Sequence, residues 1–541
     1  MTASKSAIAT CLLLLFASSA AGMPGSGPDG TAASASCPSA FTPQSQESEG
    51  KVTIGGKRIV YRAVIGTLVV HPKDWVEGVP CPTPVAKMTG ATLPAEAAMS
   101  YVAYFKQGNN AGIRPIVFLF NGGPGSSTVW LHMGAFGPRR VVTNDDSHTP
   151  PAPYQVVAND DSLLDAGDLV FIDAPGTGFG RIAGKDKEKA FWGVDADAHA
   201  FAAFIQAFLT KYKRWNSPKF LFGESYGTTR SAVLSNILQS DHNIDLNGII
   251  MLSQILSFDL STGGSEANPG NDMPYILTLP TFAATAWYHH KLPDQSGDIE
   301  AVIERAKAFA MGPYMAALAR GNGLAEAERQ NIATGLHNLT GLPVAYVLKA
   351  NLRVSGGEFE KTLQADSDTT TGRLDTRFSG PTMDPLSKNA QYDPQSAAIS
   401  SAYVSAFNNY ARQTLKYGGD GPFYPGASVF KFWDFKHKQP GARFAFPGAL
   451  NVMPDLAAAM KYNPRLKILL TGGYFDLATP FYEGLYEMAQ LPIQDRLKDN
   501  ISYRYYPSGH MIYAHMPSLK ALHDDVAAFI EKTVAGEREG S

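Results

Sequence analysis

The stretch Phe220-Leu221-Phe222-Gly223-Glu224-Ser225-Tyr226-Gly227 constrains the fold of this 541-residue chain more than any other. An apolar run leads into Gly-x-Ser-x-Gly, and residues 228–238, which have helical character, follow. A strand, a sharp turn and a helix in this order are typical of a nucleophile elbow, which exposes the serine hydroxyl at the end of a sheet. A surface turn containing a serine has the same pattern, so the interpretation depends on the rest of the chain.

Short, continuous apolar runs recur along the chain and predict an α/β fold. They resemble parallel strands that are covered on both faces, and they occur at residues 114–120, 168–173, 220–222, 248–252 and 466–470. Residues 194–213, between two of these runs, have helical periodicity, and such alternation indicates a mostly parallel sheet flanked by helices. Residues 51–71 and 97–105 have strand-like alternation, with Gly55-Gly56 as a turn.

Three chemically active side chains follow strand-like segments in the order serine, aspartate, histidine. Ser225 ends the elbow strand, Asp476 follows the run at 466–470, and His510 follows a later strand. This is the chain order of α/β-hydrolase triads. His510 would take the proton of Ser225 and return it to the leaving group, while Asp476 would hold the imidazole tautomer. Singly, Asp476 could cap a helix and His510 could be a turn residue. His515 competes with His510, but no glycine precedes it and we expect it on the following helix.

An acyl-transfer enzyme also needs two N–H groups that bind the developing oxyanion. Tyr226, the residue after the nucleophile, is one predicted donor. Gly123, in the loop Asn121-Gly122-Gly123-Pro124-Gly125, is the other, although a plain Gly/Pro turn has the same sequence. The glycine-rich residues 173–180 lack the spacing of a dinucleotide loop. The histidines lack metal-ligand spacing, so we expect neither cofactor nor metal.

Several of these motifs resemble the serine carboxypeptidase family: Asn-Gly-Gly-Pro-Gly at 121–125, the Asp-Ala-Pro-Gly segment from 173, Gly-Glu-Ser-Tyr at 223–226 and Gly-His-Met at 509–511. The resemblance runs in the same order from about residue 115 to the C-terminal helix. It implies an α/β-hydrolase fold and a cofactor-free hydrolase that removes C-terminal residues from peptides. It also implies site roles: Ser225, Asp476 and His510 as triad, Gly123 and Tyr226 as oxyanion hole, and Asn121 and Glu224 as ligands of the substrate's C-terminal carboxylate.

The chain departs from the family pattern at four places. Ser126 replaces the usual cysteine, Ala135 replaces an acidic residue before Gly-Pro, Gly227-Thr228 replaces Ala-Gly, and Ala478-Thr479-Pro480 replaces Cys-Asn. The last two changes also occur in related α/β-hydrolase aminopeptidases. An aminopeptidase or esterase on the same fold is therefore an alternative function. A catalytically silent binding protein is a second alternative, against which the complete triad and both oxyanion glycines speak.

The chain divides into five predicted parts: a signal peptide (1–22), a flexible lead-in (23–50), a first hydrolase part (51–258), an inserted cap (259–460) and a second hydrolase part (461–541). The signal peptide is inferred from Lys5, the apolar core at 8–17 and the small residues that follow. It predicts export to a secreted or periplasmic location. Helix-like segments at 299–319 and 325–336 lie in the cap.

The cysteines and the net charge limit the cellular compartments and the binding partners that suit this protein. Cys37 and Cys81 remain after cleavage and predict one disulfide in an exported protein, with two free thiols as the alternative. A net charge of −3 implies neither nucleic acid nor an anionic membrane as a partner. The family resemblance implies peptides with a free C-terminus as the partners. Glu224 beside a substrate carboxylate would have a raised pKa, which predicts a mildly acidic optimum.

Overall fold

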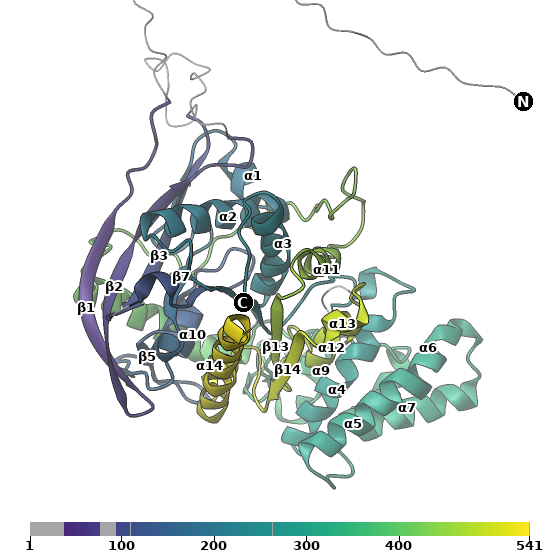
Figure 1. Cartoon of the computed structure of the whole chain (residues 1–541). Coiled ribbons are helices and arrows are strands. Elements are labelled where there is room, and N and C mark those ends of the chain that lie inside the picture. Colours follow the sequence, from purple (N-terminus) through teal and green to yellow (C-terminus); the bar gives the residue numbers. More distant parts are fainter. Residues whose placement is uncertain (1–36, 76–92, 109, 262, 264, 540–541) are drawn as a thin grey trace, which may run out of the picture.

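The structure, a computed structural model, describes residues 37–75, 93–108, 110–261, 263 and 265–539. A twisted sheet crosses the molecule, with helices on both of its faces and a separate group of helices at one end (Figure 1). The strand order is β1 (Ser45–Ile54), β2 (Lys57–Val70), β3 (Glu96–Lys106), β7 (Asp168–Ile172), β4 (Ile116–Phe120), β9 (Lys219–Glu224), β10 (Gly248–Leu252), β13 (Lys467–Gly473) and β14 (Ile501–Tyr506). β8 (Arg181–Ala183) pairs with β3.

Strand direction divides the sheet into two parts. β1, β2, β3 and β7 pair antiparallel, whereas β7, β4, β9, β10, β13 and β14 run parallel. The predicted apolar runs correspond to five of the parallel strands, β4, β7, β9, β10 and β13, which are largely buried on both faces, whereas β14 is partly exposed. Sheet order and direction are those of the α/β-hydrolase fold, as the sequence predicted. The carboxyl ends of β9, β13 and β14 therefore bring three loops to one edge of the sheet.

The helices are α1 (Lys187–Phe191), α2 (Val194–Lys211), α3 (Tyr226–Ser240), α4 (Met273–Tyr288), α5 (Ile299–Phe309), α6 (Met315–Arg320), α7 (Glu326–Thr340), α8 (Val344–Lys349), α9 (Gly356–Thr362), α10 (Pro394–Asn409), α11 (Met453–Tyr462), α12 (Phe481–Ala489), α13 (Asp495–Lys498) and α14 (Met516–Glu539). Two small hairpins pair β5 (Arg139–Val141) with β6 (Val156–Ala158) and β11 (Thr369–Thr371) with β12 (Ser379–Pro381).

Alternate residues of each parallel strand enter two hydrophobic cores. On β4, Phe118 and Phe120 pack into the core that also contains residues of α2, α3 and α11. Val117 and Leu119 point to the other face and share a core with residues of α10 and α14. This strict alternation follows from the two-residue period of a strand. It fixes the register of the strands that carry the candidate site.

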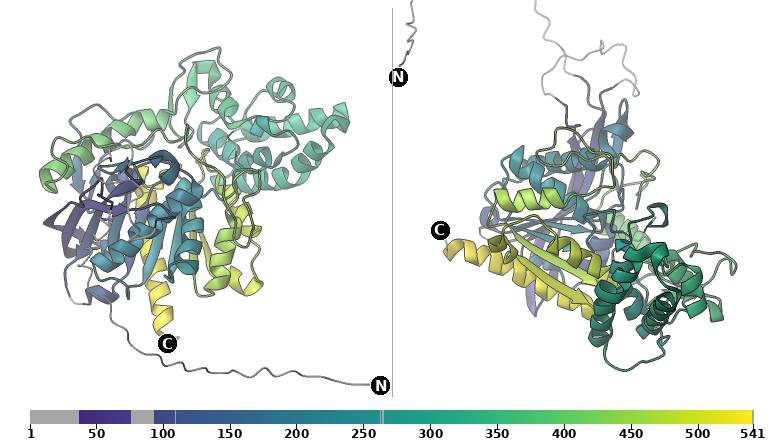
Figure 2. Two further views of the ribbon diagram at one scale, coloured as in Figure 1. Left: turned by 90° about the horizontal axis from the view of Figure 1, so that it is seen from above. Right: turned by 90° about the vertical axis from the view of Figure 1, so that its right-hand side faces the viewer.

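The cap is shorter than predicted. Helices α4 to α9 share a hydrophobic core of their own, and they form the group that extends beyond the end of the sheet (Figures 1 and 2). By contrast, α10 and α11 belong to the two layers that cover the sheet. The predicted cap boundary at residue 460 is therefore wrong, because Leu456 and Met460 of α11 are buried in the hydrolase core.

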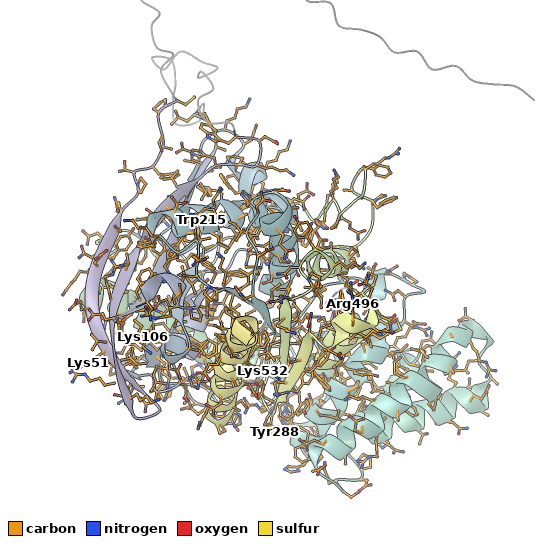
Figure 3. The ribbon with its side chains drawn as sticks, viewed as in Figure 1. Lys51, Lys106, Trp215, Tyr288, Arg496 and Lys532 are labelled. Atoms are coloured by element: carbon orange, nitrogen blue, oxygen red, sulfur yellow. The ribbon has the colours of Figure 1, made fainter. Side chains whose placement is uncertain are left out.

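The predicted lead-in is also too long. Residues 45–50 belong to β1, which pairs with β2 from Ser45 opposite Gly66 to Ile54 opposite Lys57. Upstream of β1, Ser39 Oγ and Ala40 N both donate hydrogen bonds of 2.8 Å to the carboxylate of Glu96. Figure 3 shows Lys51 on this outer strand, at the edge of the sheet farthest from the cap. Residues 23–36 and the predicted signal peptide, 1–22, lie outside the described residues.

Cys37 is disulfide-bonded, and its expected partner Cys81 lies outside the described residues. We expect a non-reduced digest of the mature protein to contain the Cys37 and Cys81 peptides covalently linked. Cys37→Ser should then lower the free energy of unfolding by about 4 kcal/mol, because a bond between residues 37 and 81 closes the intervening stretch of the unfolded chain into a loop. Mass spectrometry and denaturant unfolding measure the two effects. Free alkylation of both thiols in native protein would contradict the prediction.

In the described part of the chain, no helix has the length and apolar character that crossing a membrane requires.

Candidate active site

Ser225 lies at a sharp turn between β9 and α3, as the sequence predicted. Its backbone has φ 60° and ψ −128°, a strained conformation for a residue with a side chain. A Cβ atom at Gly223 would lie 2.2 Å from the carbonyl oxygen of Gly227, so the turn requires glycine there. Ser225 N also donates a 2.9 Å hydrogen bond to Leu252 O at the end of β10. The turn is therefore held between two neighbouring strands.

Asp476 and His510, which are 34 residues apart in the chain, form a buried pair. His510 Nδ1 lies 2.8 Å from Asp476 Oδ2, and the Thr479 hydroxyl donates to the same oxygen at 2.8 Å. Asp476 Oδ1 accepts hydrogen bonds from the backbone N–H groups of Ala478 and Thr479, at 2.9 and 3.0 Å. The carboxylate is thus oriented by four contacts, and one of these is the imidazole.

Two opposing effects determine the pKa of His510. Burial lowers the pKa of the imidazole, whereas the carboxylates of Asp476 and Glu224 raise it, and the net result is a pKa above the ordinary value. The ring is fixed from its backbone as well, since the Ser253 hydroxyl donates to His510 O at 2.9 Å. Ser225 and His510 line the same pocket, which has a volume of about 490 Å³.

Gly123 and Tyr226, the predicted oxyanion donors, line this pocket too. Tyr226 is the first residue of α3, so its N–H has no partner within the helix. Gly123 has φ 106°, which favours glycine. Within the described residues, neither N–H donates a hydrogen bond. A Cβ on Gly122 would lie 2.4 Å from Tyr226 N, so the glycine loop lies directly against the start of α3.

Glu224 and Asn121, the predicted carboxylate ligands, meet on one wall of the pocket. Burial raises the pKa of Glu224 to about 7, although the charge of His510 and hydrogen bonds from Tyr513 and Asn121 act in the opposite direction. The Tyr513 hydroxyl donates to Glu224 Oε2 at 2.9 Å.

Tyr513 is a further residue of the site, and the sequence alone did not reveal it. It gives Glu224 a buried partner in a protein where Ala135 stands in place of the family's acidic residue. Its position three residues after His510 was the available signal, but nothing in the local pattern distinguishes it from a core tyrosine.

His515, the competitor of His510, lies just before α14 and away from the pair. Its Nδ1 lies 2.7 Å from the Ser518 hydroxyl, and its Nε2 lies 3.8 Å from a carboxylate oxygen of Asp145. The structure brings His510, and not His515, to Asp476.

An irregular strap, residues 417–452, forms part of the rim of the pocket. Phe430 and Phe435 of the strap line the pocket, and Phe435 contacts Phe258 with ring centroids 6.0 Å apart. His437 fixes the strap to the hydrolase body, because its two ring nitrogens lie 2.6 Å from Asp195 Oδ1 and 2.8 Å from Asp455 Oδ2. Burial opposes protonation of His437, yet both carboxylates together raise its pKa to about 9.

The fold, the elbow and the Asp–His pair define the class of the protein: an α/β-hydrolase with a serine-type candidate site. A family model described as serine carboxypeptidase matches residues 91–262. Pheromone-processing carboxypeptidase KEX1 of Meyerozyma guilliermondii is 31% identical over 148 residues, which are 26% of this chain and 20% of that protein. The matched stretch thus spans about a fifth of the length of the relative. By these matches, residues 91–262 of the chain are similar to the serine carboxypeptidase family.

Two solved structures are similar to this chain to different degrees. The prohormone-processing carboxypeptidase Kex1Δp of Saccharomyces cerevisiae superposes with a TM-score of 0.52 at 14% identity, over 87% of this chain and 91% of that chain. The proline iminopeptidase of Mycobacterium smegmatis reaches a TM-score of 0.34 at 12% identity, over 91% and 100% of the two chains. The first of these likenesses supports the α/β-hydrolase fold.

Proposed function

We propose that the chain is an exported serine-type carboxypeptidase that hydrolyses C-terminal peptide bonds through an acyl-enzyme on Ser225. The observation that carries the proposal is the hydrogen bond between Asp476 and His510, because His510 lines one pocket together with the elbow serine and the buried Glu224. The family match over residues 91–262 supports it. Export is proposed from residues 1–22, and peptides with a free C-terminus are the proposed partners.

The chemistry takes two steps. Ser225 Oγ attacks the scissile carbonyl while His510 takes its proton, and the N–H groups of Gly123 and Tyr226 bind the oxyanion. The C–N bond then breaks, His510 protonates the departing amine, and the acyl group remains on Ser225. In the second step, water that is deprotonated by His510 adds to this ester. The bond between the acyl carbon and Ser225 Oγ then breaks, His510 returns the proton to Ser225 Oγ, and the shortened peptide is released. Asp476 stabilises the imidazolium that forms each time.

Glu224 is the residue proposed to select the C-terminus of the peptide over its N-terminus. A substrate carboxylate would repel an ionised Glu224, whereas a protonated Glu224 can donate a hydrogen bond to it. Burial favours this protonated form, since it raises the pKa of Glu224 to about 7. Asn121 supplies a second polar side chain on the same wall. The pocket thereby suits the free C-terminus of a peptide at pH values below about 7.

The alternative is an aminopeptidase or esterase on the same fold. For the aminopeptidase, the supporting residue is again Glu224. Once Glu224 has lost its proton, its carboxylate would attract a substrate ammonium group. Peptides blocked at one end separate the two activities. A carboxypeptidase cleaves N-blocked peptides and releases their last residue, whereas an aminopeptidase requires a free N-terminus. Turnover of N-free peptides alone would contradict the proposed function.

The pH profile provides a second test. For free-acid peptides, kcat/KM should rise as His510 loses its proton and fall as pH increases through about 7, where Glu224 loses its own. Because the pKa of His510 is itself raised above its ordinary value, the rise lies close to this fall, so the optimum should be narrow and near neutrality. Amidated peptides carry no carboxylate, so their alkaline fall should be weaker. Glu224→Gln keeps a donor at every pH and should flatten the fall for free acids. Identical profiles for both substrates in both proteins would remove Glu224 from carboxylate recognition.

A further inference from the structure

Arg373 is an arginine that lines the candidate active-site pocket together with Ser225, Glu224 and His510. Its side chain is exposed. Across the described residues, its guanidinium forms neither an ion pair nor a hydrogen bond. The neighbouring Arg377 is different, because it is paired with Asp375 at 2.6 Å and with Asp145 at 3.1 Å. Arg373 therefore keeps all its donors available to a molecule in the pocket.

The backbone that carries Arg373 is tied to both candidate catalytic loops. Leu477 N, beside Asp476, donates to Arg373 O at 3.0 Å, and His510 N donates to Leu374 O at 2.6 Å. Arg373 N in turn donates to Asp393 Oδ1 at 2.7 Å, which joins it to the start of α10. Main-chain contacts thus fix the backbone of Arg373 relative to His510.

Two serine residues line the pocket together with Arg373. Asp393 Oδ2 accepts a 2.7 Å hydrogen bond from Ser396 N, so Ser396 lies beside the Arg373 backbone. Ser400 follows one helical turn later, and both serines line the pocket. Asp393 itself is occupied, since it accepts hydrogen bonds from three backbone N–H groups. The lining of the pocket thus contains a guanidinium and two serine hydroxyls, which are groups that donate hydrogen bonds to carboxylate oxygens.

The nearby acidic groups leave the charge of Arg373 largely uncompensated. Burial raises the pKa of Glu360 to about 8, so this carboxyl is mainly protonated at neutral pH, although Arg373 acts against the shift. Glu224 lies on another part of the lining, and its carboxyl group already accepts hydrogen bonds from Tyr513 and Asn121. The field of Arg373 also extends to His510, whose pKa it lowers.

We propose that Arg373 is a specificity-determining residue that binds a substrate carboxylate next to the scissile bond. This inference rests on the proposed peptidase function. The guanidinium forms two parallel hydrogen bonds with a carboxylate, a geometry that lysine cannot reproduce. The carboxylate has two possible sources, which share one chemistry: the C-terminal carboxylate of the peptide, or an acidic side chain beside the cleaved bond.

Arg373→Met removes the charge while keeping an unbranched side chain, and a two-by-two set of substrates distinguishes the sources. The set consists of N-blocked Phe-Leu and Phe-Glu, each as free acid and as amide. If Arg373 binds the C-terminus, kcat/KM should fall about 10- to 100-fold for both free acids and little for the amides. If it binds an acidic side chain, the same fall should affect both Phe-Glu peptides. N-blocked Glu-Leu tests the residue before the bond.

Controls separate recognition from general damage. Arg373→Lys keeps the charge and should retain part of the selectivity. Arg58→Met, at an exposed arginine on β2, should change none of the ratios. Loss of Arg373 also raises the pKa of His510, but this affects every substrate alike, so the ratios are compared on the pH plateau. An equal change for all five substrates, or no change for any, would overturn the proposal.

Binding to an inactive protein keeps the test independent of turnover. We would measure anisotropy of fluorescein-labelled Phe-Leu and Phe-Glu, as acids and amides, with Ser225→Ala. The additional Arg373→Met change should weaken binding of one carboxylate class by about 10- to 100-fold. If no peptide is hydrolysed but this difference is found, the proposed activity fails while Arg373 recognition holds. Equal affinities for acids and amides of both sequences would overturn Arg373 recognition.

Discussion

Ser225→Ala and His510→Ala should each lower kcat by about 10⁶-fold, and the double variant should be hardly less active than either single one. The two residues act as a unit, because the serine is a weak nucleophile without the base and the base has no role without the serine. The residual rate would come from the oxyanion donors and from substrate binding. Peptide hydrolysis, followed by product chromatography, measures the effect.

His515→Ala is the matched control for His510→Ala. His515 is within 2.7 Å of the Ser518 hydroxyl and has no contact with Asp476, so its loss should leave kcat within about threefold of the original. A fluorophosphonate probe should label the unmodified protein at Ser225 and should fail to label the Ser225→Ala variant. Loss of turnover in His515→Ala, with turnover preserved in His510→Ala, would refute the assignment of the base.

The sequence predicted the parallel sheet and the three loops that follow its strands. It could do so because the central parallel strands are buried on both faces and are therefore mostly apolar, as in β4 and β10. The elbow was predictable for a related reason: Gly223 and Gly227 are required by close backbone contacts that no other residue can make. Local chemistry determined these features, so a local pattern revealed them.

The sequence-based predictions failed where tertiary packing, and not the local sequence, determines the structure. The first half of β1 is exposed and polar, because it lies on the outermost strand, and it therefore has the composition of a loop. Nothing in the sequence indicates that α11 packs on the sheet of the hydrolase part and does not belong to the cap. Tyr513 and Arg373 could not be identified, since contacts with residues distant in the sequence place both of them: Glu224 for the first, and Asp393 with Leu477 for the second.

Asp476→Asn tests the electrostatic part of the candidate triad and should lower kcat by about 10⁴-fold. The asparagine carbonyl can replace Oδ1 as acceptor for the N–H groups of Ala478 and Thr479. Its NH₂ group then faces His510 Nδ1, where the carboxylate oxygen accepted a hydrogen bond at 2.8 Å. Nδ1 becomes an acceptor, and the proton moves to Nε2. The imidazole can then no longer accept the proton of Ser225.

Thr479→Val is the companion of this variant, because Thr479 contacts both partners while carrying no charge. Its hydroxyl donates to Asp476 Oδ2 and lies 3.2 Å from His510 Nδ1. Its loss leaves the carboxylate and the histidine tautomer in place, so kcat should fall by only about 10-fold. Circular dichroism should show both variants folded, and the rate of fluorophosphonate labelling should follow kcat. An Asp476→Asn variant that retained activity within 10-fold of the original would show that the serine does not depend on the Asp476–His510 pair.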